Sequence, residues 1–486
     1  MNEVLLKLEP AILWKHFKAL CDIPRPSKKE GKAIDYVYDF GKEQGLETIK
    51  DDTGNVIIKK PATGGMEDRK TVVLQGHLDM VPQKNSDKDH DFETDPIEAL
   101  VEGEWVTANG TTLGSDNGIG VAAALAVLES KKLKHGPVEA LFTIDEETGM
   151  TGAFGLKPGL LEGDILINMD SEEEGELYVG CAGGLNANAE FSYTEVPVQD
   201  NVVTYNLNVT GLKGGHSGLD INLGRANSNK LLTRFLKYAS NYYSLRLVSI
   251  DGGSLRNAIP RESFAVVTLP AEKENDFLVA ASDFEKIFKL ELALVEPDLK
   301  FSVEKTSSPS VTIDPESQIN LIHALHVCPN GVIRMSDSME GLVETSTNLA
   351  VVKSENGKIR VQCLLRSSVD SAKDDLASRI QSLFQLAGAE VKFDGGYPGW
   401  NPNPDSTILK VMKGVYTKKY DREPEMKAIH AGLECGLLGG VYPNLDMISF
   451  GPTIKYPHSP DEKVHVESVQ KFWDFLVDTL ENVPGK

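Results

Sequence analysis

The sequence Thr71-Val-Val-Leu-Gln-Gly-His-Leu-Asp-Met-Val-Pro82 (residues 71–82) combines an apolar strand with two ionisable side chains at its carboxyl end. Side chains of a strand alternate between two faces, so His77 and Asp79 are expected on the same side and Leu78 on the other. A carboxylate beside a histidine fixes which ring nitrogen carries the proton, as is common when the other nitrogen binds a metal. The stretch therefore predicts a buried strand that ends at a functional site.

The segments on either side of this stretch alternate between short apolar strands and helices. We expect helices within 10–46 and over 118–133 and 406–420, and strands over 55–59, 71–75, 138–144, 164–169 and 446–450. Alternation of this kind is typical of an α/β domain built on a mostly parallel sheet.

The pattern changes near residue 190. From Val202 onward the strands alternate apolar and polar residues, which indicates a sheet with one solvated face, and helices are expected over 227–240 and 276–294. The Gly/Pro-rich stretch 395–404 ends this region. Because 486 residues exceed what one core usually holds, we expect an inserted α+β domain at 191–399 within a domain made of 1–190 and 400–486.

The charge balance excludes several classes of partner. The chain carries 72 acidic and 50 basic side chains, a formal net charge of −22, which opposes binding to nucleic acid or to anionic membranes.

The five cysteines are odd in number, widely spaced and without a Cys-x-x-Cys motif, so we expect reduced thiols that serve as packing residues. Neither a signal peptide nor an apolar run of about 18 residues is present, so a cytoplasmic protein is expected.

Acidic residues and a histidine recur at the ends of other predicted strands and in strand-to-helix loops. They are Asp116 in the loop 113–120, Glu146 and Glu147 after the strand 138–144, Asp170 after the strand 164–169, and His458 in the segment 451–460. Ligands of an open α/β sheet bind beyond the carboxyl ends of its strands, so these side chains are expected to converge with His77.

The donor set predicts a metal site. Two imidazoles and three carboxylates are more than one tetrahedral zinc with an open position requires. Two metal ions about 3.5 to 4 Å apart, bridged by a carboxylate, would use all five donors. The natural assignment gives Asp116 as the bridge, His77 and Asp170 as ligands of one metal, and Glu147 and His458 as ligands of the other.

Glu146 is the candidate general base. Adjacent residues project in different directions, so Glu147 can bind metal while Glu146 faces a substrate and moves a proton from water to the leaving amine. A Glu-Glu pair alone is more often solvated surface, and its position after the apolar strand 138–144 favours the functional interpretation. The sequence has no dinucleotide-binding glycine motif, P-loop, Gly-x-Ser-x-Gly or His-Glu-x-x-His.

Several motifs together resemble those of the dinuclear zinc peptidases, the family that includes aminoacylase, carnosinase and bacterial dipeptidases. They are His77-Leu-Asp79, Gly-Ser-Asp116-Asn-Gly, Glu146-Glu147, Asp170 and Pro457-His458-Ser459. Three other stretches are most similar to the bacterial dipeptidases within it: Gly-Leu-Lys-Gly-Gly-His216-Ser-Gly, Leu255-Arg-Asn-Ala-Ile-Pro and His430-Ala-Gly-Leu-Glu-Cys-Gly. The resemblance covers essentially the whole chain.

The resemblance implies that 1–190 and 400–486 form the catalytic domain and that 191–399 form a lid. It implies two Zn²⁺ ions per subunit, held by the five donors above, with Mn²⁺ or Co²⁺ as substitutes that such sites also accept. Asp79 would orient His77, and Glu146 would be the base.

The resemblance also assigns substrate contacts. His216 would polarise the scissile carbonyl, and Asn257 and Arg366 would hold the substrate carboxylate, for which a guanidinium is well suited. An ordinary salt bridge within the lid is the alternative for Arg366. Glu434 would meet the free amino group, and the alternative is an acid that stabilises a helix start.

These assignments imply a dipeptidase that cleaves unblocked L-dipeptides, Xaa-His among them, by attack of a metal-bridged hydroxide. An aminoacylase or a tripeptidase of the same family is one alternative, and Glu434 argues against the aminoacylase. A catalytically silent metal- or peptide-binding homologue is the other, and retention of all five ligands and Glu146 argues against it. A homodimer through the lid is expected from the resemblance, and whether His216 acts in its own chain or in a partner's stays open.

Overall fold

The computed structural model describes residues 2–486, which divide into two compact units. The first comprises the chain up to Gly180 together with Pro402–Ala428 and Leu433–Lys486, and the second comprises Cys181–Asn401 and Ile429–Gly432. The chain enters the second unit at residue 181 and not at 191, because the strand that follows belongs to the sheet of that unit. The short return at 429–432 was not expected from the sequence.

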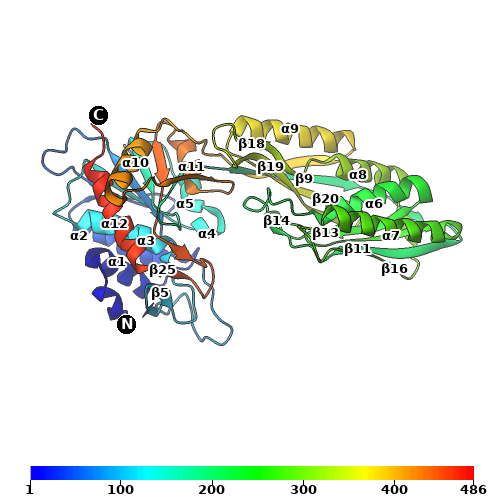
Figure 1. Cartoon of the computed structure of the whole chain (residues 1–486), viewed down its shortest axis with the longest axis horizontal. Coiled ribbons are helices and arrows are strands. Elements are labelled where there is room, and N and C mark those ends of the chain that lie inside the picture. Colours follow the sequence, from blue (N-terminus) through cyan, green and yellow to red (C-terminus); the bar gives the residue numbers. More distant parts are fainter. Residues whose placement is uncertain (1) are drawn as a thin grey trace. The chain divides into compact units, whose positions relative to one another are not determined.

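An eight-stranded sheet forms the centre of the first unit (Figure 1). In order across the sheet its strands are β1 (Glu47–Lys50), β2 (Val56–Lys60), β6 (Val138–Thr143), β3 (Val72–His77), β7 (Ile165–Asn168), β23 (Asp446–Ser449), β8 (Glu176–Cys181) and β22 (Glu425–Ile429). Parallel pairing joins the four central strands β6, β3, β7 and β23, and antiparallel pairing joins β1 to β2, β2 to β6 and β23 to β8. The expected α/β class is confirmed.

Helices and a small sheet complete the first unit. The helices are η1 (Glu3–Lys7), α1 (Ala11–Asp22), α2 (Gly31–Glu43), α3 (Ser115–Glu129), α4 (Glu146–Gly149), α5 (Thr151–Gly155), α10 (Thr407–Tyr420), α11 (Glu434–Val441) and α12 (Val466–Glu481). The small sheet has the order β24 (Ile454–Lys455), β25 (Lys463–His465), β5 (Trp105–Ala108) and β4 (Ala99–Glu102). Helix α3 is apolar on all sides and is buried along almost its whole length, as such a helix must be.

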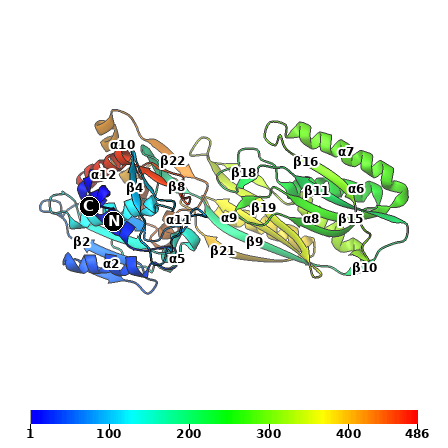
Figure 2. The ribbon, with the colours of Figure 1, turned by 90° about the horizontal axis from the view of Figure 1, so that it is seen from below.

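The second unit is built on a nine-stranded antiparallel sheet (Figure 2). Its order is β16 (Lys300–Lys305), β11 (Val202–Thr210), β15 (Ser263–Pro270), β13 (Arg246–Gly252), β19 (Val343–Glu355), β20 (Lys358–Ser367), β9 (Gly183–Ser192) and β21 (Glu390–Tyr397), with β18 (Gly331–Met335) paired to β19. Two short pairs join β10 (Glu195–Pro197) to β17 (Val311–Ile313) and β12 (Gly215–His216) to β14 (Ala258–Ile259). The helices are α6 (Ser228–Tyr243), η2 (Ala271–Lys273), α7 (Glu274–Glu291), α8 (Pro315–Val327) and α9 (Asp370–Leu386).

The core of the second unit lies between this sheet and its helices. Tyr205, Leu207 and Val209 alternate as buried residues along β11, and Phe235 and Phe277 contribute from α6 and α7. In a sheet with one solvated face, every second side chain of a strand is buried. No helix within residues 2–486 has the length together with the apolar run that a bilayer crossing requires.

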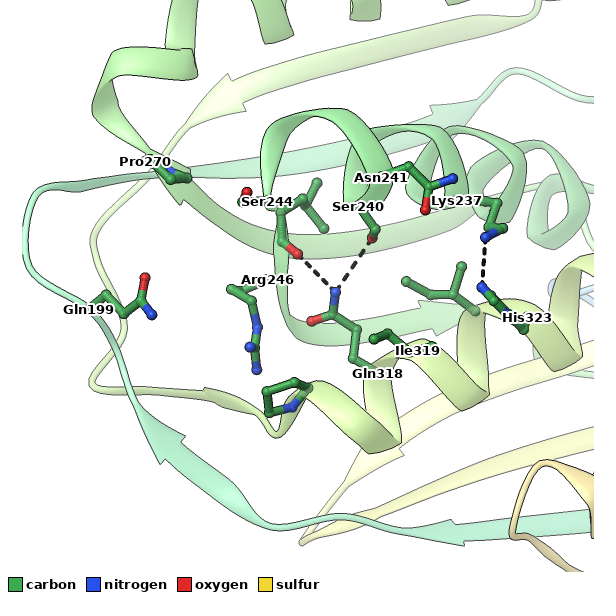
Figure 3. Close-up of a pocket in the computed structure, with 13 residues that line it drawn as sticks. Gln199, Lys237, Ser240, Asn241, Ser244, Arg246, Pro270, Gln318, Ile319 and His323 are labelled. Carbon is green, nitrogen blue, oxygen red and sulfur yellow. Dashed lines mark hydrogen bonds between the residues drawn. The ribbon is translucent and has the colours of Figure 1, made fainter.

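A cavity of about 450 Å³ lies in the second unit beside α6, β13 and α8 (Figure 3). Gln318 Nε2 donates hydrogen bonds across it to the carbonyl of Leu245 (2.8 Å) and to Ser240 Oγ (3.4 Å). Lys237 Nζ lies 2.6 Å from His323 Nε2 at the other end. The cavity lining contains none of the residues predicted to form the functional site.

Candidate active site

The predicted metal ligands lie together in the first unit, where the central parallel strands end. His77 is the last residue of β3, Glu147 lies in α4 just after β6, and Asp170 follows β7. Asp116 lies at the start of α3, and His458 follows β24. His77, Glu147 and Asp170 thus stand just at or beyond strand ends of the kind at which α/β sheets bind ligands.

Two groups of three donors share one carboxylate. His77 Nε2 lies 3.2 Å from Asp116 Oδ1 and 3.3 Å from Asp170 Oδ1. His458 Nε2 lies 3.3 Å from Asp116 Oδ2 and 2.9 Å from Glu147 Oε2. The donor atoms within each group lie within 4.8 Å of one another. Asp116 therefore presents one oxygen to each group, which is the geometry of a bridging ligand.

The chemistry of this donor set fits divalent cations. Three carboxylates are gathered at one place, and Glu147 Oε1 is buried without a hydrogen-bond partner in the part of the chain described. Buried carboxylates are costly unless positive charge compensates them. Imidazole and carboxylate together suit zinc, manganese and cobalt.

The pKa values of the two histidines are shifted by the carboxylates that surround them. Hydrogen bonds with Asp116 and Glu147 raise the pKa of His458 to about 11. Burial alone would lower the pKa of His77, but Asp170 and the hydrogen bond with Asp116 raise it well above its ordinary value. Burial raises the pKa of Asp170 to about 7. The carboxylates beside the two imidazoles thus raise the pKa of both histidines.

Asp79 contacts both His77 and the segment that carries the two glutamates. Its Oδ1 lies 3.3 Å from His77 Nδ1, and its carboxylate accepts the backbone N–H groups of Glu146 (3.0 Å) and Glu147 (3.2 Å). Burial alone would raise its pKa, but the hydrogen bond with His77 lowers it to about 2. Asp79 therefore contacts the side chain of one predicted ligand and the backbone of another.

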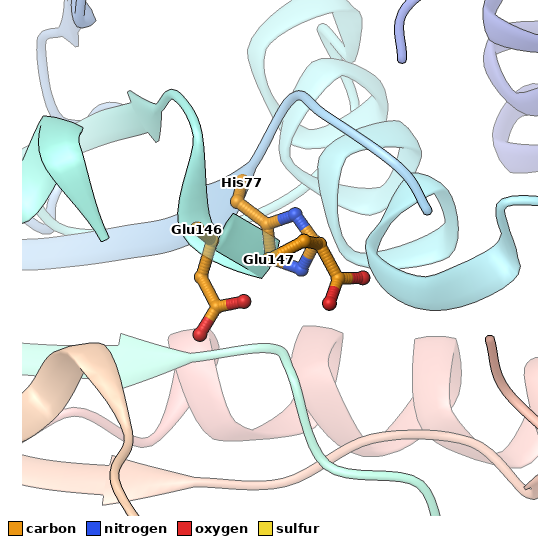
Figure 4. A group of neighbouring side chains, drawn as sticks. All are labelled: His77, Glu146 and Glu147. Carbon is orange, nitrogen blue, oxygen red and sulfur yellow. The ribbon is translucent and has the colours of Figure 1, made fainter. Parts of the chain in front are cut away.

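Glu146 lies beside the ligands without belonging to either group of three around Asp116. One of its oxygens lies within 4.8 Å of donor atoms of His77 and Glu147, and Figure 4 shows the two glutamate carboxylates pointing in different directions. Burial raises the pKa of Glu146 well above its ordinary value. A more basic carboxylate at this position is suited to accept a proton.

Glu434 is the first residue of α11 and is 1% exposed. Its Oε2 accepts hydrogen bonds from Gln75 Nε2 (2.6 Å) and Thr143 Oγ1 (2.8 Å), side chains of β3 and β6. Its Oε1 is buried without a hydrogen-bond partner among residues 2–486, and burial raises its pKa to about 7. The residue therefore stands at a helix start, and one of its oxygens has no protein donor.

The other predicted site residues lie in the second unit. His216 Nδ1 accepts the backbone N–H groups of Gly218 (3.3 Å) and Leu219 (3.1 Å), so the neutral ring carries its proton on Nε2. Burial, followed by the charge of Arg366, lowers the pKa of His216. The carbonyl of Asn257 accepts the N–H of Ser217 (2.8 Å), which places Asn257 beside this histidine in the chain fold.

Arg366 is 5% exposed and contacts Tyr397 Oη through Nη1 at 3.3 Å. No carboxylate pairs with its guanidinium in the described chain, so the alternative of an ordinary salt bridge has no partner there. A buried cation without an anion is costly, which points to an anionic ligand.

Three buried residues near these sites were not predicted. His430 Nε2 is hydrogen-bonded to Ser346 Oγ (2.7 Å) in the second unit, and burial lowers its pKa to about 3. Arg25 and Glu462 contact the backbone of the ligand-bearing loops in the first unit. A side chain that binds backbone groups leaves no pattern in the sequence; the only available signal was that Glu462 lies four residues after His458.

The chain is similar to known proteins along almost its whole length. Residues 73–482 match the sequence profile of the peptidase family M20/M25/M40. The cytosol non-specific dipeptidase of Escherichia coli K12 is 47% identical over 482 residues, which cover 99% of each chain. The crystal structure of aminoacylhistidine dipeptidase from Vibrio alginolyticus superposes with a TM-score of 0.95 and 52% identity over 100% of both chains. An aminopeptidase of Bacillus cereus, 15% identical, shares the fold with a TM-score of 0.58 over 98% of this chain and 99% of its own.

Proposed function

The chain belongs to the peptidase family M20/M25/M40, and on this premise we propose that it is a metal-dependent dipeptidase that hydrolyses unblocked L-dipeptides, aminoacyl-histidines among them. The observation that carries the proposal is the pair of donor groups that share Asp116, with Glu146 beside them. Relatives 47% and 52% identical over the whole chain are named dipeptidases. We also propose that it acts in the cytosol, as the name of the relative from Escherichia coli says of that protein.

His77, Asp116 and Asp170 would hold one divalent ion, and Asp116, Glu147 and His458 would hold a second. We propose zinc for both, with manganese or cobalt as substitutes. When bound, such a pair supplies a nucleophile from water at neutral pH and polarises the peptide carbonyl. Asp79 keeps His77 in the tautomer and orientation that metal binding requires.

Glu146 would take the proton from the attacking water and give it to the nitrogen of the leaving amine. Its raised pKa favours the first transfer, because a more basic carboxylate accepts a proton more readily. The second unit would act as a lid. His216, whose Nε2 carries the proton, would donate a hydrogen bond to the scissile carbonyl oxygen.

Charged groups would select both ends of the substrate. Arg366, which has no acidic partner in the described chain, would bind the terminal carboxylate with Asn257. Glu434, whose Oε1 has no hydrogen-bond donor among residues 2–486, would accept the free amino group. A substrate with an acylated amine loses one of these contacts, which favours a dipeptidase over an aminoacylase.

The reaction class is tested with a mixture of β-alanyl-histidine, Leu-His, a tripeptide and an N-acetyl amino acid, incubated with the zinc-loaded protein and followed by mass spectrometry. We expect selective loss of the dipeptides. Loss of the acetylated compound alone would identify an aminoacylase, loss of the tripeptide alone a tripeptidase, and no loss with zinc, manganese or cobalt a silent homologue. The homodimer expected from the resemblance is checked by light scattering on the same sample.

A further inference from the structure

We propose that Arg25 and Glu462 are positioning residues that hold the loop of Asp116 against the loop of His77 and so set the spacing of the metal ligands. The inference rests on the proposed metal site and goes beyond its ligands. Neither side chain belongs to the donor groups, and both are 2% exposed. Their partners are almost all backbone atoms of the two loops that carry Asp116 and His77.

Glu462 accepts five hydrogen bonds from one short stretch of chain. Its Oε2 accepts the N–H groups of Leu113 (2.8 Å) and Gly114 (3.0 Å). Its Oε1 accepts the N–H groups of Ser115 (2.7 Å) and Asp116 (3.3 Å) and the hydroxyl of Ser115 (2.6 Å). Consecutive N–H groups at the start of a helix form an anion site, and here a carboxylate of the same chain occupies it. One of these N–H groups belongs to Asp116, the proposed bridging ligand.

Arg25 joins that stretch to the end of β3. Its Nη1 donates to the carbonyls of Leu78 and Asp79 (2.9 Å each), the residues that follow the ligand His77. Its Nη2 donates to the carbonyl of Gly114 (2.5 Å). One guanidinium therefore links the loop of one ligand to the loop of another, a task for which its several fixed donors are suited.

The two residues meet at Gly114, whose N–H is bound by Glu462 and whose carbonyl is bound by Arg25. Gly114 has a φ of +70°, and a Cβ added there would lie 2.7 Å from Arg25 Nη2. The glycine is therefore required both by its backbone conformation and by the approach of the guanidinium. This close fit leaves the start of α3 with little freedom to move.

Glu462 is also tied to the metal site through its own segment. His458, four residues earlier, faces Asp116 Oδ2 at 3.3 Å, so the segment 458–462 contacts the Asp116 loop at both ends. Because Asp116 belongs to both donor groups, a displacement of its loop would alter the spacing of the donors in both groups. Residues that orient metal ligands typically change metal affinity about 10- to 100-fold when they are replaced.

Glu139 offers a matched control in the same unit. It is also 2% exposed, and it accepts the N–H groups of Glu162 (2.9 Å) and Gly163 (3.0 Å), which carry no metal ligand. A Glu-to-Gln change at either position places an amide donor against backbone N–H donors, so both changes are expected to destabilise the fold. Only the change at Glu462 is expected to alter metal binding.

The test measures binding of Co²⁺ to metal-free wild-type protein, E462Q and E139Q by titration calorimetry and by the Co²⁺ absorption spectrum, without reference to turnover. We expect E462Q to bind Co²⁺ about 10- to 100-fold more weakly than wild type, with an altered spectrum, and E139Q to match wild type. Equal Co²⁺ binding by E462Q and E139Q would overturn the inference. Failure of wild type to bind any Co²⁺ would instead overturn the proposed function.

Two milder variants keep the inference testable if E462Q does not fold. S115A removes one of the five donors to Glu462, and R25K replaces the two linking nitrogens of the guanidinium by one ammonium nitrogen. We expect both to weaken Co²⁺ binding, R25K more than S115A, because it removes contacts to both loops. Wild-type affinity and spectrum in both variants would overturn the inference.

Discussion

At the scale of single residues, the site depends on carboxylates with different environments. Asp79 accepts the backbone N–H groups of Glu146 and Glu147 and has a lowered pKa, whereas burial raises the pKa of Glu146. The contact between Asp79 and His77 follows from strand periodicity and could be predicted from the sequence. The hydrogen bonds from the N–H groups of Glu146 and Glu147 to Asp79 could not be predicted from the sequence, because they depend on how two strands lie side by side.

Replacing Glu146 by Gln should separate metal binding from turnover. The amide keeps the size of the side chain but cannot accept the proton, so we expect a loss of about 10²- to 10⁴-fold in kcat. Zinc content, measured by elemental analysis, should equal that of wild type. Turnover near the wild-type value would remove Glu146 from the mechanism.

Burial of His16 should make stability fall in mildly acidic solution. His16 is 2% exposed, and burial lowers its pKa to about 4 from an ordinary value of 6.5. Between pH 6.5 and pH 4 the unfolded chain binds more protons at this residue than the folded chain, so stability is full above pH 6.5 and declines as pH falls through this window. The loss should reach about 3 kcal/mol near pH 4.

The measurement is urea unfolding of wild type and H16Q at several values between pH 7 and pH 4. H16Q should be less stable at neutral pH, because it loses the edge contact with Phe40, but its stability should depend less on pH. Parallel pH profiles for the two proteins would show that His16 does not cause the decline.

At the scale of elements, the pattern of apolar residues predicted several helices and strands, including β3, β6, β7 and α10, but not the helices α8, α9 and α12. It failed at β9, where Gly183-Gly-Leu-Asn-Ala-Asn-Ala-Glu-Phe-Ser contains few large apolar residues, so the domain boundary was expected about ten residues too late. The predicted ligands converge because parallel strands end at one edge of the sheet. The positions of Arg25 and Glu462 could not be predicted in this way, because their partners are mostly backbone groups, which every residue has.

The start of α8 offers a local test of the second unit. Asp314 caps this helix by accepting the N–H of Ser317 (2.9 Å), and it also accepts the N–H of Thr194 (3.0 Å). D314A should destabilise the helix start by about 1 kcal/mol, whereas D314N, which can still cap, should have a smaller effect. Hydrogen exchange of the first amides of α8 is the measurement, and equal exchange in D314A and wild type would contradict the assignment.

At the scale of the whole molecule, the proposed metal ligands all come from the first unit, although they span residues 77 to 458 of the sequence. Bound metal stabilises the folded state of whatever region holds it. Removing metal with a chelator should therefore reduce protection from hydrogen exchange in β3 and α3 of the first unit, with little change in α6 and β15 of the second. A uniform loss of protection across both units would be inconsistent with this view.

The order of strands in the first sheet has a consequence for biosynthesis. β23 (Asp446–Ser449) lies between β7 and β8, although these two strands precede it in the chain by the entire second unit. A growing polypeptide therefore carries unpaired strand edges where β23 will insert, and such edges favour aggregation. His458 and Glu462 emerge from the ribosome later still, so the proposed donor groups stay incomplete until after β23 has been made.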